Sequence, residues 1–275
     1  MTEINNTGMK RAALINDLSC IGNCSLSVGM PIMSCYGVET VALPTAVLST
    51  HTTGFDGYVA HDMTAQMHAF SAHWKAMRVK FDCIYTGYFA SLEQISFAEG
   101  FIRDFGGKDV LTVVDPVMGD EGALYDGFTP AHVAAMRRLC EKADVITPNY
   151  TEAAFLSGLT ADAGAEAMLA ALKTPDVIIT GVRRGDEVGY VARLGGKDME
   201  FFRPWESAVL HGTGDVFTSA FCGELLQGAT RRAAFIAAAE LCDACIKETA
   251  RRRGGFWYGL AFEEVLRRRF MRKQD

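Results

Sequence analysis

A short segment with two glycines around a threonine, followed by an aspartate, carries the residue types best suited to chemistry. Gly212, Thr213, Gly214 and Asp215 precede an apolar stretch that runs to about Leu226 and has the pattern of a helix. Glycines let backbone N–H groups approach an anion closely, and a helix N-terminus adds unpaired donors and partial positive charge. An ionised aspartate beside such an anion site could accept the proton of an alcohol during phosphoryl transfer. The alternative is that Thr213 or Asp215 only caps the helix.

Two further segments place carboxylates and an amide where apolar runs end. Asp115 and Asp120 surround one such end, and a polar loop containing Tyr125 follows them. Paired carboxylates there suit Mg²⁺ held through water near a triphosphate, and an ordinary Asp-Pro turn is the alternative. Asn149 and Glu152 open another helical stretch, where capping is the alternative. The sequence contains no Walker-type phosphate loop and no protein-kinase signature, so a kinase would need a different phosphate-binding design.

Short apolar runs alternate with amphipathic stretches of helical length along most of the chain. The apolar runs are rich in Val and Ile, as buried parallel strands are, and they include Ala12–Ile15, Val38–Leu43, Cys83–Tyr85, Val110–Val114, Asp144–Ile146 and Val177–Ile179. The expected helices include Met63–Met77, Gln94–Phe105, Pro130–Lys142 and Ala161–Leu172. The alternation predicts an α/β fold with a doubly wound, mostly parallel central sheet and helices on both faces.

Polar residues directly follow several apolar runs, and they include Asn16, Thr86, Asp115, Thr147 and Thr180. Ligands in open α/β sheets bind outside the carboxyl ends of the strands, so these residues suggest a cleft there. Val188–Leu194 and Met199–Phe202 flank two glycines and predict a hairpin at one sheet edge. Composition does not change sharply anywhere, so we expect a single domain over residues 1–275.

The bulk composition excludes several classes of protein. Hydrophobic residues make up 49% and charged residues 22% of the 275 residues, which is typical of a globular protein. A net charge of −6 argues against a nucleic-acid partner, and the basic runs Arg251–Arg253 and Arg267–Arg269 are interpreted as solvated helix surface. The polar N-terminus lacks the apolar core of a secretory signal, and no apolar stretch is long enough to span a membrane. We therefore expect a cytoplasmic protein without a membrane partner.

The cysteines are interpreted as reduced thiols that fill the core. Eight are present, scattered through apolar segments. Cys242 and Cys245 form a C-x-x-C, but it lies in the middle of an expected helix, whereas a redox pair would open a helix after a strand. No second pair completes a zinc site, and Cys20 and Cys24 are assigned to the core in the same way.

In this order and at these separations, the segments from about Ala12 to about Gly228 resemble the ribokinase-like superfamily and, within it, the pyridoxal/pyridoxamine kinases. The motifs that carry the resemblance are Gly22-Asn23, Thr45 with Ser49–Thr52, Thr86–Tyr88, Asp115–Asp120, Thr147–Asn149 with Glu152, Ile179-Thr180 and Gly212–Asp215. The resemblance implies ATP-dependent phosphorylation of the 5′-hydroxymethyl group of a vitamin B6 vitamer. It also implies Mg²⁺ and a monovalent cation such as K⁺ as cofactors, and a homodimer.

The resemblance also implies a role for each matching residue on the nucleotide side. Asp215 is similar to the catalytic base of the family, and the backbone of Gly212–Gly214 is similar to its anion hole. The positions that resemble the Mg²⁺ and triphosphate region are Asp115, Asp120, Asn149 and Glu152, with Asp115 and Glu152 as the metal-binding pair. Thr180 resembles a residue near the nucleotide phosphates and the monovalent cation. Tyr125 would belong to a loop that closes over the site.

On the substrate side, the residues that resemble contacts to the pyridine ring are Asn16, Thr45 and Tyr88. Tyr88 could stack on the ring or clamp it, and His51 lies near the expected substrate side. The chain departs from the family pattern at Asn16, where serine is frequent.

Two alternatives remain at this point. A hydroxymethylpyrimidine (phosphate) kinase has the same fold and mechanism, and Asn16-Asp17 with Ser19 is similar to the start of that branch. The Gln-Ala-Asp run expected soon after is missing, because the chain reads Gly22-Asn23-Cys24-Ser25. A non-catalytic protein that binds a B6 vitamer is the alternative of another class, and it would not need a base at Asp215.

Overall fold

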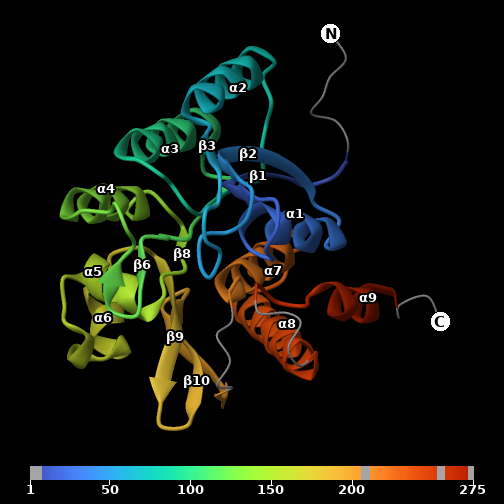
Figure 1. Ribbon diagram of the computed structural model, residues 1–275. Helices are drawn as coiled ribbons and strands as arrows, with labels where there is room; N and C mark the ends of the chain where they lie inside the picture. The colour runs from blue at the N-terminus through green and yellow to red at the C-terminus, as the bar shows by residue number, and fades with distance from the viewer. Residues whose placement is uncertain (1–7, 206–210, 253–257, 272–275) are drawn as a thin grey trace. The chain divides into compact units, whose positions relative to one another are not determined.

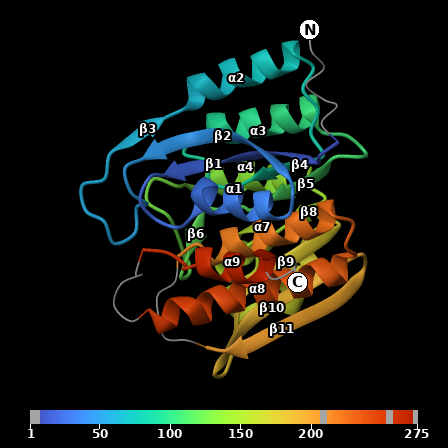
Figure 2. The same ribbon diagram turned by 90° about the vertical axis from the view of Figure 1, so that its right-hand side faces the viewer.

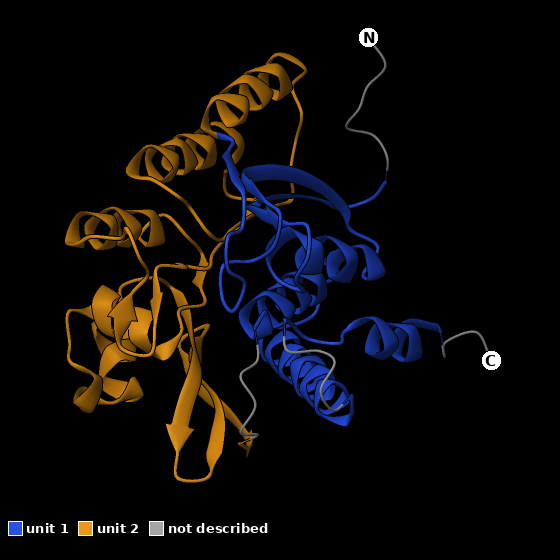
Figure 3. Ribbon diagram, in the orientation of Figure 1, with its two compact units in different colours: residues 1–63, 206–275 blue, residues 64–205 orange. Residues whose placement is uncertain are grey.

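The computed structural model describes residues 8–205, 211–252 and 258–271 of the chain. The chain divides into two compact units, one formed by Met1–Met63 with Glu206–Asp275 and the other by Thr64–Trp205 (Figure 3). The first unit therefore combines both ends of the chain, whereas the second is one continuous segment. The expectation of a single domain over residues 1–275 stays a prediction.

The first unit combines a small strand layer with helices (Figure 1). Its elements are β1 (Arg11–Ser19), α1 (Ser25–Cys35), β2 (Glu39–Leu48), β3 (Ala60–Asp62), α7 (Thr213–Leu226), α8 (Arg231–Arg251) and α9 (Glu263–Met271). β1 and β2 run parallel, with Ala12 opposite Thr40, and β3 adds an antiparallel strand beside β2. α7 packs against α1 and α8, and its Phe217 contacts Phe221 and the Phe235 ring of α8 in the buried core.

The second unit contains the longer run of alternating elements. They are α2 (Thr64–Ala76), β4 (Cys83–Thr86), α3 (Leu92–Phe105), β5 (Leu111–Val114), β6 (Gly119–Asp120), β7 (Ala123–Leu124), α4 (Pro130–Cys140), β8 (Val145–Ile146), α5 (Tyr150–Ser157), the 3₁₀ turn η1 (Ala161–Ala163), α6 (Ala165–Ala171), β9 (Asp176–Arg184), β10 (Glu187–Leu194) and β11 (Lys197–Pro204). Within the unit the strand order is β11-β10-β9-β8-β5-β4, and β6 pairs with β7 separately. Figure 2 shows α2 and α3 side by side, joined by aromatic contacts such as Trp74 with Phe101.

The strand directions confirm the predicted mostly parallel α/β fold. β4 pairs parallel with β5, β5 with β8, and β8 with β9, as β1 does with β2, whereas β9 pairs antiparallel with β10. The parallel strands are built largely from the predicted apolar runs. The predicted hairpin is also confirmed, because β10 and β11 pair antiparallel with Leu194 opposite Lys197 and β11 lies at the sheet edge. Gly195 and Gly196 both have positive φ, as a two-residue turn that matches strand twist requires.

One expected helix and part of the cysteine assignment are wrong. Instead of a single helix over Ala161–Leu172, η1 ends before Gly164, whose φ of +85° breaks the chain direction, and α6 begins only at Ala165. Cys242 and Cys245 are buried inside α8, as predicted, but Cys20 and Cys35 are exposed and Cys24 is only partly buried. An apolar segment of sequence does not reveal which of its side chains face the solvent. Among the described helices, none has the length and apolarity needed to cross a membrane.

Candidate active site

The N-terminus of α7 is built as an open anion site. Gly212 precedes the helix with a left-handed backbone (φ +83°), and no side chain caps the first turn. A Cβ at Gly212 would lie 2.2 Å from the carbonyl oxygen of Asn23, so only glycine fits this approach. Asp215 lies in the first turn of α7, as predicted. The N-cap position is Gly212, so neither Thr213 nor Asp215 occupies it. The N–H groups of the first turn are the predicted anion donors.

The Asp215 carboxylate is held by neighbours from β1 and α1. Asn16 Nδ2 donates to Asp215 Oδ1 at 3.4 Å, and the backbone N–H of Ser25 donates to the same carboxylate. Burial, with a smaller contribution from the nearby Asp17, raises the pKa of Asp215 to about 7, although the hydrogen bonds from Ser25 and Asn16 lower it. A carboxylate with a pKa near neutrality is a competent proton acceptor at neutral pH.

Three residues predicted for the substrate side lie in the same unit as Asp215. Asn16 and Thr45 are buried in the carboxyl-terminal halves of β1 and β2, and Asn16 donates a hydrogen bond to Asp215. His51 uses both ring nitrogens within the protein, since Nδ1 accepts from the Thr53 N–H and Nε2 lies 3.1 Å from the Tyr258 carbonyl oxygen. Burial lowers the pKa of His51. The His51 ring also contacts the Phe55 and His211 rings, and its role in substrate binding stays a prediction.

In the second unit, Asn149 and Glu152 form a capping box at the start of α5. Asn149 Oδ1 accepts from the Glu152 N–H at 2.9 Å, and Glu152 Oε2 accepts from the Asn149 N–H at 2.8 Å. The same two side chains also hold the β6 segment, because Glu152 Oε1 accepts from the Met118 N–H and Asn149 Nδ2 donates to the Gly119 carbonyl. Burial raises the pKa of Glu152 to about 8. The capping interpretation is therefore confirmed, and the same side chains fix the segment that leads to Asp120. A role of this pair beside Mg²⁺ and the triphosphate stays a prediction.

The predicted metal-binding pair does not form a direct cage of protein ligands. Asp115 is buried after β5, and its N–H donates to the Thr86 carbonyl. Both Glu152 oxygens already accept backbone N–H groups. Within the described ranges, no group of three or more His, Cys, Asp or Glu side chains is placed to hold a metal. This set fits a Mg²⁺ that takes most of its ligands from phosphate oxygens and water, as Mg²⁺ commonly does.

The remaining predicted residues of the second unit are Thr180, Tyr88 and Tyr125. Thr180 forms a parallel bridge with Asn149, and its N–H donates to the Pro148 carbonyl at 2.9 Å. Tyr88 and Tyr125 each contact Phe128, with ring centroids 6.0 and 6.3 Å apart. Phe128 was not singled out from the sequence, because a lone aromatic residue in a polar loop carries no readable pattern. Phe128 therefore contacts both Tyr88, the expected contact to the pyridine ring, and Tyr125 of the expected closing loop.

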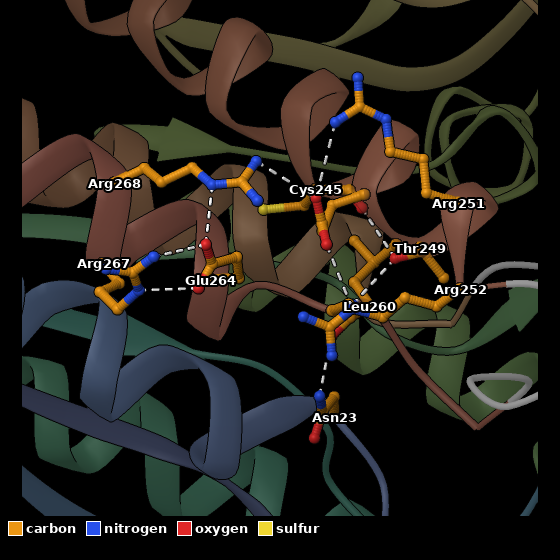
Figure 4. A network of polar contacts seen from close by, with 11 residues as sticks. Asn23, Cys245, Thr249, Arg251, Arg252, Leu260, Glu264, Arg267 and Arg268 are labelled. Atoms are coloured by element: carbon orange, nitrogen blue, oxygen red, sulfur yellow. Dashed lines mark hydrogen bonds and ion pairs between the residues drawn. The ribbon is translucent and has the colours of Figure 1, made fainter.

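The backbone of Asn23 lies against Gly212 at the predicted anion site. The sequence indicated Asn23 only as part of a family motif, and its contacts were not predicted. Its Nδ2 donates to the Leu260 carbonyl at 2.7 Å and to Glu263 Oε1 at 3.2 Å, and its backbone pairs with Gly259. Figure 4 shows that Leu260 adjoins a network of polar contacts in which the Thr249 hydroxyl accepts from the Ala261 N–H.

The basic runs contribute to the same network (Figure 4). Arg252 and Arg268 pair with Glu248, and Arg267 pairs with Glu264. Arg251 lies 3.9 Å from the same Glu248 carboxylate. Arg253 lies outside the described residues. These arginines are largely engaged with glutamates on the surface of α8 and α9, in line with their interpretation as helix surface.

A mostly parallel α/β fold, with an aspartate in the first turn of a helix that begins after a glycine, is typical of the ribokinase-like small-molecule kinases. The chain belongs to the phosphomethylpyrimidine kinase family, whose model matches residues 30–257, and within that group it is related to the pyridoxal and pyridoxine kinases.

Several relatives illustrate this placement. A Bacteroides thetaiotaomicron protein assigned to the phosphomethylpyrimidine kinases is 37% identical, with a TM-score of 0.92 and coverage of 99% of this chain and 98% of that one. A second crystal form of that protein contains pyridoxal (TM-score 0.88). Pyridoxal kinase from Lactobacillus plantarum is 32% identical over 96% of this chain and 97% of its own, with a TM-score of 0.88.

Two matches from Bacillus subtilis add to this comparison. A pyridoxine kinase is 36% identical over 188 residues, which span 61% of this chain and 65% of that protein. A structure of pyridoxal kinase from the same organism is a complex with ADP. It is 26% identical, with a TM-score of 0.75, and the match covers 87% of this chain and 92% of that one.

Proposed function

We propose that this protein is a pyridoxal kinase that transfers the γ-phosphoryl group of ATP to the 5′-hydroxymethyl group of a vitamin B6 vitamer. The observation that carries the proposal is Asp215, a carboxylate with its pKa raised to about 7 in the first turn of an uncapped helix. The class of substrate follows from the relatives, since one is named a pyridoxal kinase, one a pyridoxine kinase, and another was crystallised with pyridoxal. ATP is the donor that the kinase family and its ADP-bound relative support.

Each residue of the first unit has a defined task in this transfer. Asp215 accepts the proton of the hydroxymethyl group. The hydroxymethyl oxygen then bonds to the γ-phosphorus as the bond between that phosphorus and the departing ADP oxygen breaks. The N–H groups at the start of α7 stabilise the charge on the moving phosphoryl group. Asn16 orients the Asp215 carboxylate through its 3.4 Å hydrogen bond. Asn16, Thr45 and His51 are the proposed contacts to the vitamer, together with Tyr88 of the second unit.

The second unit supplies the proposed nucleotide side. Asp115, Asp120 and Glu152 would hold Mg²⁺ largely through water, and a bound Mg²⁺ neutralises charge on the β- and γ-phosphates. Asn149 and Thr180 lie on adjacent bridged segments and would line the triphosphate, with K⁺ as the proposed monovalent cation near Thr180. Tyr125, 42% exposed, is placed on a surface loop from which it could close over the ligand.

A hydroxymethylpyrimidine phosphate kinase is the second candidate, because the matching family model carries that name. It would use the same base and anion site, so the two candidates differ only in the ring that is bound. A non-catalytic binding protein is disfavoured, since binding alone gives no reason to place a carboxylate of raised pKa at an anion site.

The test is ADP release with Mg²⁺-ATP against pyridoxal, pyridoxine, pyridoxamine, hydroxymethylpyrimidine and ribose. We expect turnover with the pyridines, and Asp215→Asn should lower kcat by about 10²–10⁴-fold while vitamer binding persists. Turnover on the pyrimidine alone would replace the substrate and keep the mechanism. Binding without turnover on the whole panel would favour the non-catalytic alternative, and near-normal activity of Asp215→Asn would remove Asp215 from its role.

A further inference from the structure

A second buried carboxylate lies one residue after Asn16, and the transfer described above gives it no task. Asp17 is 7% exposed and accepts two hydroxyl hydrogen bonds, from Ser25 Oγ at 2.6 Å and from Ser19 Oγ at 3.0 Å. Burying an ionisable group is unfavourable unless its hydrogen bonds are satisfied. We propose that Asp17 is a positioning residue for Asp215, acting through Ser25 and Asn16; this inference rests on the proposed role of Asp215 as the base.

The first connection runs through Ser25. Its hydroxyl donates to Asp17 Oδ1, and its backbone N–H donates to the Asp215 carboxylate. Ser25 has a φ of +53°, a left-handed conformation that residues other than glycine rarely adopt. Such a conformation persists only where neighbouring contacts hold it. The short bond to Asp17 is the contact that fixes the Ser25 side chain, and it thereby directs the Ser25 N–H towards the base.

The second connection runs through Asn16. The backbone N–H of Asp17 donates to Asn16 Oδ1 at 3.0 Å, which fixes the plane of the amide. The other end of that amide, Nδ2, donates to Asp215 Oδ1 at 3.4 Å. A bond of that length is weak by itself. The direction in which the amide meets Asp215 therefore depends on the anchor at Asp17.

The charge of Asp17 also acts on the base. The titratable groups that face Asp17 are Asp215, Cys24 and His51. Burial raises the pKa of the Cys24 thiol to about 12, and burial lowers the pKa of His51, so both are neutral at neutral pH. No neighbouring cation of this set screens the two carboxylates from each other. The negative charge on Asp17 raises the pKa of Asp215, and its removal should lower that pKa.

Two variants separate the contact from the charge. Asp17→Asn keeps the shape and removes the charge, whereas Ser25→Ala keeps the charge and removes the hydroxyl contact. The matched control is Ser27→Ala in the same helix, because Ser27 Oγ donates only to the Cys24 and Gly22 carbonyls and has no bond to either carboxylate. We would measure kcat and KM of each variant on the best substrate of the panel from about pH 5 to pH 9.

Both variants should lose about 10-fold or more in kcat with KM for the acceptor little changed, because a misoriented base in Ser25→Ala and a less basic one in Asp17→Asn both slow the chemical step. Only Asp17→Asn should also move the acid limb of kcat/KM to lower pH. The control should match the wild type in both respects. Wild-type kcat and pH profile in Asp17→Asn, or an equal loss in Ser27→Ala, would overturn the inference.

These outcomes are distinguishable from failure of the proposed function. If the wild type acts on the pyrimidine only, the same measurements apply to that substrate. If Asp215→Asn is fully active, the base itself is misassigned. Carboxyl ¹³C NMR of aspartate-labelled protein gives a readout without turnover: Asp17→Asn should lower the titration midpoint of Asp215, and an unchanged midpoint would overturn the coupling. Circular dichroism verifies that each variant is folded.

Discussion

At the scale of single residues, the site combines buried carboxylates with few opposite charges. Asp215 has its pKa raised to about 7, mainly by burial, and Asp17 beside it is raised in the same direction for the same reason. A group whose pKa is higher in the folded state than in the unfolded chain favours folding most when protonated. The ionised form of Asp215, which is the form that can accept a proton, therefore destabilises the folded protein.

This opposition gives a prediction for the stability of Asp215→Asn. The stability that wild-type Asp215 contributes is fully present below about pH 4, the usual pKa of an aspartate, and is lost as the pH rises through its folded pKa of about 7. The asparagine avoids the buried charge, so its advantage over the wild type should grow between pH 5 and pH 8. We expect a relative gain on the order of 2 kcal/mol, measured by urea unfolding of both proteins at the two pH values.

Other titrating groups cancel in that difference, since the two proteins share them. A difference that stays constant between the two pH values would mean that Asp215 titrates near its ordinary pKa in the folded protein. The pH–rate profile provides an independent comparison, because kcat/KM of the wild type should fall as the pH drops below about 7 and the base becomes protonated.

Which residues could be predicted from the sequence depends on how local their chemistry is. Asp215 was predictable because a Gly-Thr-Gly-Asp segment before an apolar helix has a local chemical meaning. Asp17 and Ser25 were not predicted as partners of the base, because their connection depends on Ser25 meeting both carboxylates after the turn that follows β1. Hydrogen bonds between residues far apart in sequence leave no periodic pattern in it.

At the scale of elements, the start of α7 depends on two kinds of constraint at Gly212. Its φ of +83° is unfavourable for other residues, and its Cα lies against the Asn23 backbone. Asn23 is in turn tied to Leu260 and Gly259, so the segment before α9 supports the segment before α7. The proposed anion site therefore depends on the close approach of two backbone segments, at Gly212 and Asn23, and its proposed donors are backbone N–H groups.

Gly212→Ala should abolish this arrangement, and Gly228→Ala is its matched control. Gly228 has a similar φ of +87°, but a Cβ there would meet nothing within 4 Å. The control should cost about 1 kcal/mol of stability from backbone strain alone, whereas Gly212→Ala should cost on the order of 2–4 kcal/mol because Asn23 must also move. Turnover should fall at least ~10²-fold in Gly212→Ala and stay near normal in Gly228→Ala. Thermal unfolding and ADP release measure the two effects, and equal losses in both variants would contradict the close approach.

The elements themselves were predictable to the extent that their patterns were regular. The buried strands β1, β4, β5, β8 and β9 were found from apolar runs, and the β10–β11 hairpin was found from its two glycines. The short strands β3, β6 and β7 were missed, because β3 is exposed throughout and neither β6 nor β7 contains a buried apolar pair like that of β8. The break at Gly164 was missed because alanines on both sides continue the helical pattern.

At the scale of the whole chain, the proposed catalytic and nucleotide roles follow the division into two units. The residues proposed to act on the hydroxyl and the moving phosphoryl group come from the two ends of the chain, while those proposed for Mg²⁺ and the triphosphate come from Thr64–Trp205. The family could be predicted from the order and separation of short motifs. The network behind Asn23 could not, because it depends on α8 and α9 meeting residues near the N-terminus.

The homodimer that the family resemblance implies stays a prediction, and an exposed strand edge offers a surface for it. β3 is the last strand beside β2 and is exposed throughout, and the residues before it are apolar, with Tyr58 44% and Val59 70% exposed. An exposed apolar edge of this kind is suited to pairing with a second chain.

Light scattering after gel filtration should give twice the chain mass of 29.9 kDa. Val59→Lys should shift the equilibrium towards the monomer, because pairing would bury its charge. The control Leu159→Lys, at a position 37% exposed in the loop after α5, should remain dimeric. A monomeric wild type would exclude the dimer, and a dimeric Val59→Lys would place the interface on another surface.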